Sequence, residues 1–277
     1  MFRDWVARWR GRQGQQTRPK SYAQAQWEHH HAPANQPLQA PAGAALPPGL
    51  RVYAMGDVHG RADLLAEKFA AIDADLAARP AASHVEILLG DYVDRGPRAR
   101  DVIGLILARR RGGCLEALAG NHEELFLRFL DGDLTLQHWR EMGGAETLLS
   151  YGLAAPRLFH SLDEEISFTR RCQEAVPADH VTFLRTLPTH REVGDYFFVH
   201  AGVRPQAPLA EQSLEDLLWI RNEFLDWSGG FGRIVVHGHT PVGRPEVRSN
   251  RINLDTGAYI TGVLTCLVLE GSRLHFL

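Results

Sequence analysis

The sequence predicts an α/β fold with two packed β-sheets in one domain, and three observations predict it. From residue 49 onward, short apolar runs alternate with segments of helical periodicity, which is the pattern of a parallel sheet. Several of these runs end in glycine followed by a polar residue. Four more apolar runs follow a long helical stretch. These later runs indicate a second sheet packed on the first.

The first half of this region alternates strands with helices. The predicted strands are Leu50–Met55, Val85–Leu89 and Cys114–Leu118, and the predicted helices are 61–79, Asp101–Arg111 and Asn121–Leu130. Residues 131–190 are predicted to be mainly helical. The later strands are predicted at Tyr196–His200, Arg233–His237, Arg248–Leu254 and Gly262–Leu269. In parallel sheets, ligands bind in the loops that follow the carboxyl ends of the strands.

Residues 1–48 differ in composition from the predicted domain, residues 49–277. They are rich in Gln, Ala and Pro, so we expect a disordered tail. The tail carries a net charge of +4 and the remainder −7. Residues 2–12 have the pattern of a short basic amphipathic helix that makes weak contact with an anionic membrane or a partner; a frayed end is the alternative. His29–His31 are interpreted as a solvated tract rather than a metal site.

Composition excludes several classes of protein. Hydrophobic residues make up 44% and charged residues 23%, as in ordinary globular domains. No apolar run approaches the roughly 20 residues of a membrane-spanning helix, and the first ten residues do not form a secretory signal. Three separated cysteines fit a reducing compartment, so we expect a cytoplasmic protein. The acidic main domain argues against nucleic-acid binding.

Polar residues follow five of the predicted strands. The motifs are GDVHG at 56–60, GDYVDRG at 90–96, GNHE at 120–123, HAG at 200–202 and HGHT at 237–240. Each alone is weak evidence, because a polar residue after a strand often caps a helix or makes a turn. Together they bring Asp, His and Asn side chains to one edge, and these side chains are ligands for divalent metals. A shared carboxylate can hold two such ions about 3.5–4 Å apart.

In this order, the five motifs resemble the phosphoprotein phosphatase family of calcineurin-like metallophosphoesterases. The resemblance is nearest to bacterial and phage serine/threonine protein phosphatases and covers roughly residues 50–270. It implies a four-layer fold, with two stacked mixed sheets flanked by helices. It also implies a dimetal site at the C-terminal edge of the strands.

The resemblance assigns a role to each motif residue. Six are implied metal ligands: Asp57 and His59 for the first ion, Asp91 for both, and Asn121, His200 and His239 for the second. Four others are implied to act on the substrate: Arg95 and Arg221 grip the phosphate, and His122 is the general acid, oriented by Asp94. Arg221, in the run LWIRNE, matches a looser motif than the others.

These residue types suit the hydrolysis of a phosphomonoester. Two divalent ions, for which we expect manganese with iron or zinc as alternatives, would activate a bridging water for direct attack. Arginine supplies paired planar donors for phosphate. His122 would protonate the leaving oxygen, and we expect the nearby Asp94 to keep the imidazole cationic.

Three other features have less specific interpretations. His237 shares a strand face with His239, and we favour a supporting or packing role over ligation. Asp255, at another strand end, either orients a ligand histidine or makes a turn. Arg109–Arg111 end a helix, where positive charge suits the helix dipole, and are assigned no ligand.

Three functions compete. The first is a serine/threonine-type protein phosphatase acting on a phosphorylated protein or small molecule, favoured by the intact VDRG and the Glu of GNHE. The second is a dinucleoside tetraphosphatase of the symmetrical type on the same site. The third is an inactive scaffold that binds phosphorylated partners, which the loss of a ligand would signal. No ligand is missing from the motif set, so we rank the three in this order.

Overall fold

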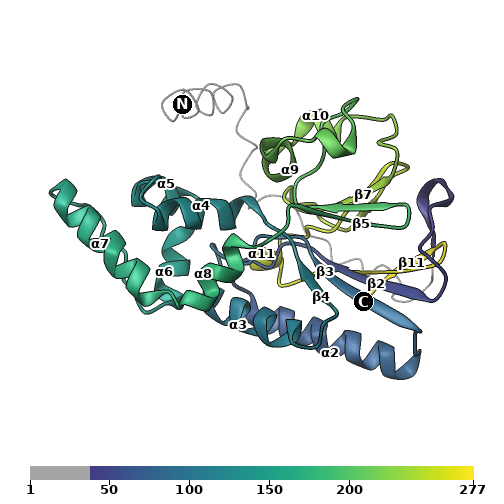
Figure 1. Cartoon of the computed structure of the whole chain (residues 1–277), viewed down its shortest axis with the longest axis horizontal. Coiled ribbons are helices and arrows are strands. Elements are labelled where there is room, and N and C mark those ends of the chain that lie inside the picture. The colour runs from purple at the N-terminus through teal and green to yellow at the C-terminus, as the bar shows by residue number, and fades with distance from the viewer. Residues whose placement is uncertain (1–37) are drawn as a thin grey trace. The chain divides into compact units, whose positions relative to one another are not determined.

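The structure, a computed structural model, describes residues 38–277. Two sheets lie face to face with helices on their outer faces (Figure 1). Val52, Ile87, Phe198 and Val236 fill the space between the sheets. The opposite side of the first sheet packs on helices through residues such as Tyr53. The four layers confirm the predicted α/β fold of two stacked mixed sheets flanked by helices.

The first sheet has the strand order β1-β11-β10-β2-β3-β4. The strands are β1 (Leu38–Gln39), β2 (Leu50–Met55), β3 (Ser83–Leu88), β4 (Leu115–Ala117), β10 (Cys266–Glu270) and β11 (Arg273–Phe276). Strands β2, β3 and β4 are parallel, and the other pairs are antiparallel. Helices α2 (Ala62–Ala78), α3 (Ala99–Arg110) and α4 (Asn121–Leu130) each follow one of the parallel strands. The predicted alternation is therefore confirmed to within a few residues at each boundary.

The second sheet has the order β5-β6-β7-β9-β8. Its strands are β5 (His190–Val193), β6 (Tyr196–Val199), β7 (Ile234–His237), β8 (Glu246–Val247) and β9 (Arg251–Asn253). Strands β6, β7 and β9 are parallel. Helices α9 (Leu214–Trp219) and α10 (Asn222–Leu225) supply residues that pack on its outer face. Loops after three parallel strands of each sheet therefore reach a common edge.

The middle of the chain is mainly helical, as predicted, with one correction. Helices α5 (Leu136–Glu141), α6 (Gly144–Ser150), α7 (Leu162–Ala175) and α8 (Ala178–Arg185) occupy it, and η3 (Leu209–Glu211) is a later 3-10 turn. Strand β5 begins at the end of the stretch predicted to be helical, and the sequence did not reveal it because its exposed residues HRE show no apolar pattern.

A second correction concerns the strand predicted at 262–269. It begins only at Cys266, after the short helix α11 (Ala258–Thr261).

Residues 38–48, which the composition assigns to the tail, pack on the domain. Strand β1 pairs with β11, η2 (Pro41–Gly43) follows, and Ala40, Ala44 and Leu46 are buried. The packed part of the chain therefore begins before the expected boundary at residue 48. Three small or apolar buried side chains, together with the β1–β11 pairing, attach this segment to the edge of the sheet. The rest of the predicted tail, including the amphipathic helix at 2–12, lies outside the described residues. Among the described helices, none combines the length and apolarity needed to cross a bilayer.

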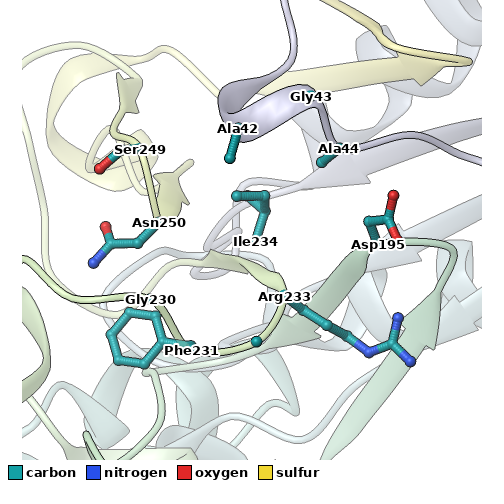
Figure 2. Close-up of a pocket in the computed structure, with 11 residues that line it drawn as sticks. Ala42, Gly43, Ala44, Asp195, Gly230, Phe231, Arg233, Ile234, Ser249 and Asn250 are labelled. Carbon is teal, nitrogen blue, oxygen red and sulfur yellow. The ribbon is translucent and has the colours of Figure 1, made fainter.

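A small pocket lies away from the predicted metal edge. Its volume is about 260 Å³, and it lies beside the start of β7, whereas His239 follows the end of that strand (Figure 2). Its lining includes Phe231, Ile234 and Asn250. Arg233, also at its wall, is paired with Glu192 at 2.9 Å. None of the predicted site residues lines this pocket.

Candidate metal centre

The carboxyl ends of five strands bring the predicted ligands together. Asp57 and His59 follow β2, Asp91 follows β3, and Asn121 begins α4 just after β4. His200 follows β6 and His239 follows β7. All six are buried, between 0% and 4% exposed. The predicted ligand set therefore converges from both sheets on one internal site.

Asp91 is at the centre of this site. Its carboxylate belongs to two groups of potential ligand atoms, one with His59 and His122 and the other with His200 and His239. Within each group, all the atoms lie within 4.8 Å of one another. Asp91 is thus the one residue that the two groups share, and its role as a bridge between two ions stays a prediction. His122 lies within the first group, although the resemblance gives it a different role.

The second group brings together atoms that could hold a cation. His200 Nδ1 lies 3.0 Å from the carbonyl oxygen of Leu89, so this nitrogen carries the proton and donates to it. Burial lowers the pKa of His200 to about 3, so the ring is neutral and Nε2 has a lone pair. Nε2 of His200 lies 2.8 Å from Asn121 Oδ1, 3.1 Å from His239 Nδ1 and 3.4 Å from Asp91 Oδ1. Nitrogen and oxygen atoms that converge in this way are suited to share a divalent ion.

The first group has the same property at His59. Its Nδ1 donates to the carbonyl oxygen of Val93 at 2.8 Å, which leaves Nε2 as an acceptor facing Asp91. Nε2 of His59 and Nε2 of His239 are both buried without a hydrogen-bond partner among the described residues. Buried polar atoms are rarely left unpaired. Oxygen and imidazole donors of this kind fit divalent metal ions.

Asp57 and Asp255 form a second acidic pair beside Asp91. Burial raises the pKa of Asp57 well above its usual value, with Asp255 and Asp91 adding to the effect. Asp57 also accepts from the backbone N–H of His239 at 3.1 Å, which joins the two sheets. Asp255 accepts from the N–H of Gly257, so the turn interpretation accounts for it. Within the described residues, Asp57 lies next to the two ligand groups but in neither of them.

Two further motif residues, His237 and Glu123, contact residues around the site rather than belonging to the ligand groups. His237 is fully buried, packs edge-on against Phe224 and approaches Arg251, so its packing role agrees with our preference. Glu123 of GNHE has a role that the sequence analysis did not identify. It accepts from the backbone N–H groups of Asp91, Tyr92 and Gly120 at 2.7–2.9 Å. This carboxylate therefore fixes the loop that carries the bridging aspartate.

His122 and Asp94 form a buried pair beside the ligands. His122 Nδ1 and Asp94 Oδ2 are 2.7 Å apart, and Arg95 donates to His122 Nε2 at 3.0 Å. Because a guanidinium can only donate, Nε2 is unprotonated and Nδ1 carries the proton. Burial lowers the pKa of His122 well below its usual value, and Arg95 and Arg221 lower it further. Our expectation that Asp94 keeps the imidazole cationic is therefore wrong for this arrangement; Asp94 fixes the ring and its tautomer.

Asp94 is itself held by residues that the sequence did not reveal. Thr147 Oγ1 donates to Asp94 Oδ1 at 2.7 Å, and Trp139 Nε1 donates to Oδ2 at 3.0 Å. Both donors come from the helical stretch, from α6 and α5. Burial nevertheless raises the pKa of Asp94 to about 7. No motif marks Trp139 or Thr147, because their role depends on tertiary contacts alone.

Two arginines flank the site and have no carboxylate partner within the described residues. Arg95 lies over the ring of Tyr259, with 5.0 Å between the guanidinium carbon and the ring centroid. Arg221 donates to the carbonyl oxygen of His239 and to Thr240 Oγ1 at 3.0–3.1 Å. Guanidinium groups without carboxylates, near a buried cluster of ligands, are suited to binding phosphate. The structure thus places both predicted phosphate-gripping residues at the metal centre.

Strained backbone is concentrated at the same place. His59, Asp91, Asp94, Arg95 and His239 all have positive φ, between +41° and +66°. Side chains other than glycine rarely adopt this conformation, and each instance costs on the order of 1–3 kcal/mol. The tight loops that aim these side chains inward are maintained against that cost by surrounding contacts.

Comparison with known proteins agrees with this geometry. The model of the calcineurin-like phosphoesterase family matches residues 50–261. The bis(5'-nucleosyl)-tetraphosphatase PrpE [asymmetrical] of Bacillus subtilis (strain 168) is 26% identical over 201 residues, which is 65% of this chain and 74% of that protein. The family match covers every predicted site residue.

Solved structures share the fold. A protein provisionally assigned as a diadenosine tetraphosphatase matches 84% of this chain and 97% of its own, at 20% identity and a TM-score of 0.57. A cold-active protein-tyrosine phosphatase of a psychrophilic Shewanella species matches 84% of this chain and 80% of its own, at 20% identity and a TM-score of 0.52. Together with the family match and the acceptor-lined site, these findings identify the chain as a metallophosphoesterase hydrolase that belongs to the calcineurin-like phosphoesterase family.

Proposed function

We propose that this enzyme hydrolyses dinucleoside tetraphosphates with two divalent ions, manganese first among them, held by Asp57, His59, Asp91, Asn121, His200 and His239. The similarity to the bis(5'-nucleosyl)-tetraphosphatase of Bacillus subtilis carries this proposal, and it favours the tetraphosphatase over the protein phosphatase that the sequence analysis ranks first. Ions in such a centre lower the pKa of bound water and neutralise phosphoryl oxygens. The lack of carboxylate partners on Arg95 and Arg221 within the described residues supports the binding of an anionic phosphate chain.

The chain's own residues position and protonate the substrate. Phosphate bound by Arg95 competes with His122 Nε2 for that guanidinium, so Nε2 becomes available. The negative charge of the phosphate also raises the pKa of His122. Nδ1–H remains donated to Asp94, which keeps Nε2 directed at the leaving oxygen.

The test compares two substrates on metal-stripped protein with manganese added back. Diadenosine tetraphosphate and a phosphoserine peptide are supplied at equal concentration, and products are separated by chromatography. The proposal expects hydrolysis of the dinucleotide to dominate. ATP with AMP would indicate asymmetrical cleavage, and two ADP would indicate the symmetrical type. Bound metal without activity on either substrate would favour the phospho-binding scaffold instead.

A serine/threonine protein phosphatase is the second candidate, and the His122–Asp94 pair favours it. An alkoxide leaving from a phosphoserine is strongly basic and needs a proton, whereas a phosphate leaving from an anhydride needs little help. A buried imidazole held at 2.7 Å by a carboxylate is suited to protonate the alkoxide that leaves from a phosphoserine. Its phosphorylated partner would then be a protein.

The variant His122→Asn tests whether His122 protonates a poor leaving group, the role on which the second candidate depends. If the natural reaction has a poor leaving group, kcat on phosphoserine falls by about 10²–10⁴-fold. The loss on an aryl phosphate, which has a good leaving group, is much smaller, while bound manganese is unchanged. An equal loss on both substrates would contradict the role of His122 as a general acid.

A further inference from the structure

Helix α7 packs on the protein through one face only. Its buried side chains, Phe168 and Cys172, belong to the main core, and Figure 1 shows it as the outermost of helices α4–α7. The opposite face carries Leu162 and Ile166, which are 69% and 49% exposed. Residues four apart lie on the same face of a helix, so these two form one apolar strip. The strip has no cover within residues 38–277.

Two charged residues lie on the same exposed face, on either side of Ile166. Asp163 and Arg170 are seven residues apart, about two helical turns. Both are exposed, and neither has an ion-pair partner in the described part of the chain. The other acids of the first turn are used locally, since Glu164 and Glu165 accept backbone N–H groups. The face thus presents Asp163 and Arg170 on either side of Ile166, with the exposed Glu174 four residues after Arg170.

This arrangement is complementary to itself. The midpoint between Asp163 and Arg170 falls between Ile166 and Ser167. A two-fold axis through that point, perpendicular to the helix, makes two copies of α7 antiparallel. Each Asp163 then lies opposite Arg170 of the other copy, and the two Ile166 side chains meet beside the axis. Such symmetric self-pairing is the usual geometry of a homodimer.

We propose that the exposed face of α7 binds a second copy of this chain as an antiparallel helix pair. The two Ile166 side chains form its apolar centre, Leu162 lies at its edge, and two symmetric Asp163–Arg170 ion pairs fix the register. An anionic membrane fits less well, because the acids of the first turn repel it. One helix pair buries less than the roughly 1,200 Å² of stable interfaces, so the dimer is weak and depends on concentration.

Sedimentation equilibrium of the full chain, from micromolar to several hundred micromolar, tests the proposal. The average mass of the wild type rises from 30.9 kDa toward twice that value. Asp163→Arg alone and Arg170→Asp alone each place like charges opposite each other, so each stays monomeric. An equimolar mixture of these two variants recovers the dimer, because the mixed pair restores both ion pairs. The double variant D163R/R170D recovers it for the same reason.

Controls separate pairing from folding and net charge. Circular dichroism and thermal melting check that each variant is folded. Glu67→Arg, on the exposed side of α2, changes net charge as much as Asp163→Arg does and leaves the dimer intact. Three outcomes overturn the proposal: a wild type that is monomeric throughout, a mixture that stays monomeric, or loss of the dimer in Glu67→Arg.

Discussion

The position of Arg95 depends on an aromatic ring rather than on a carboxylate. Its guanidinium lies 5.0 Å from the centroid of the Tyr259 ring, and the same ring packs edge-on against His59 at 5.3 Å. A carboxylate partner would hold Arg95 more tightly but would compete with phosphate. The face of a ring orients the cation without using its N–H donors, one of which reaches His122 Nε2.

Removing this ring weakens substrate binding more than it slows the reaction. Tyr259→Ala releases Arg95, and a lost contact of about 0.5–1.5 kcal/mol raises KM by about two- to tenfold. Steady-state kinetics at saturating manganese measure KM and kcat separately. Tyr259→Phe keeps the ring and is the matched control, expected to behave as the wild type. Equal KM changes in both variants would assign the effect to the hydroxyl group.

Asp94 makes the stability of the metal-free protein depend on pH. Burial raises its pKa to about 7, whereas the unfolded chain has the ordinary value near 4. A group whose folded pKa is raised contributes its full stability below the unfolded pKa and loses it as pH rises through the folded value. The free energy of unfolding of the wild type therefore falls between about pH 4 and pH 7 relative to Asp94→Asn.

Urea denaturation of both chelated proteins across this pH range measures the difference. The comparison with Asp94→Asn removes the contribution of other buried acids, since both proteins share them. A difference that grows in the opposite direction would mean that the donors Thr147 and Trp139 keep the carboxylate ionised at low pH.

At the scale of elements, the loops after β2 and β3 are in direct backbone contact. A Cβ atom on Gly96 would lie 2.0 Å from the carbonyl oxygen of His59, and one on Gly60 would lie 2.4 Å from that of Gly96. The two loops carry His59 and Asp91, which must approach each other to share an ion. Gly96 is needed here because of space, and Gly60 is needed both for space and for its positive φ of +64°.

Gly96→Ala is therefore expected to separate the two loops. Manganese affinity, measured by titration calorimetry, falls at least tenfold, and the melting temperature falls with it. Gly104→Ala is the matched control: Gly104 lies on α3, and a Cβ atom added there would meet no described atom within 4 Å. This control therefore gains about 0.5–1 kcal/mol of stability. Unchanged metal affinity in Gly96→Ala would show that the loop contact is dispensable.

Sequence periodicity predicts the elements that are apolar and local. Leu50–Met55 and Asn121–Leu130 have the predicted bounds, because a buried strand and an amphipathic helix each have their own repeat. Strand β5 escapes prediction because three of its four residues are exposed at a sheet edge. Strand β1 is only two exposed residues long, and its structure depends on pairing with β11.

The residues of the candidate site also divide into those that the sequence predicts and those that it does not. The Asp, His and Asn residues of the strand-end motifs could be predicted, because side chains of these types that follow neighbouring strands are suited to bind metal ions. Trp139, Thr147 and Tyr259 could not, since each acts through a contact with a distant residue. Arg221 is predicted from the loosest motif. The fold of the second sheet brings it next to His239, whose carbonyl oxygen accepts a hydrogen bond from it.

At the scale of the whole molecule, the proposed metal site connects the two sheets. Asp57, His59, Asp91 and Asn121 come from the first sheet's strand ends, and His200 and His239 from the second's. Burial raises the pKa of both Asp57 and Asp91 well above the usual value, with added repulsion from Asp255 and Asp91 on Asp57 and from Glu123 on Asp91. Buried carboxylates at the edge that joins the sheets therefore oppose its packing, and a bound cation would offset that cost.

Metal removal is thus expected to destabilise the whole domain rather than the loops alone. Manganese at about 100-fold above its Kd stabilises the folded state by about 2.7 kcal/mol, which raises the melting temperature by roughly 5–10 °C for a protein of this size. Differential scanning calorimetry of chelated and manganese-loaded protein measures this shift. Asp91→Asn loses most of it, because one substitution weakens both ligand groups. His237→Asn, outside the ligand groups, retains the manganese-dependent shift even if its baseline melting temperature is lower. A shift that persists in Asp91→Asn would mean that the ions bind elsewhere and that Asp91 does not bridge them.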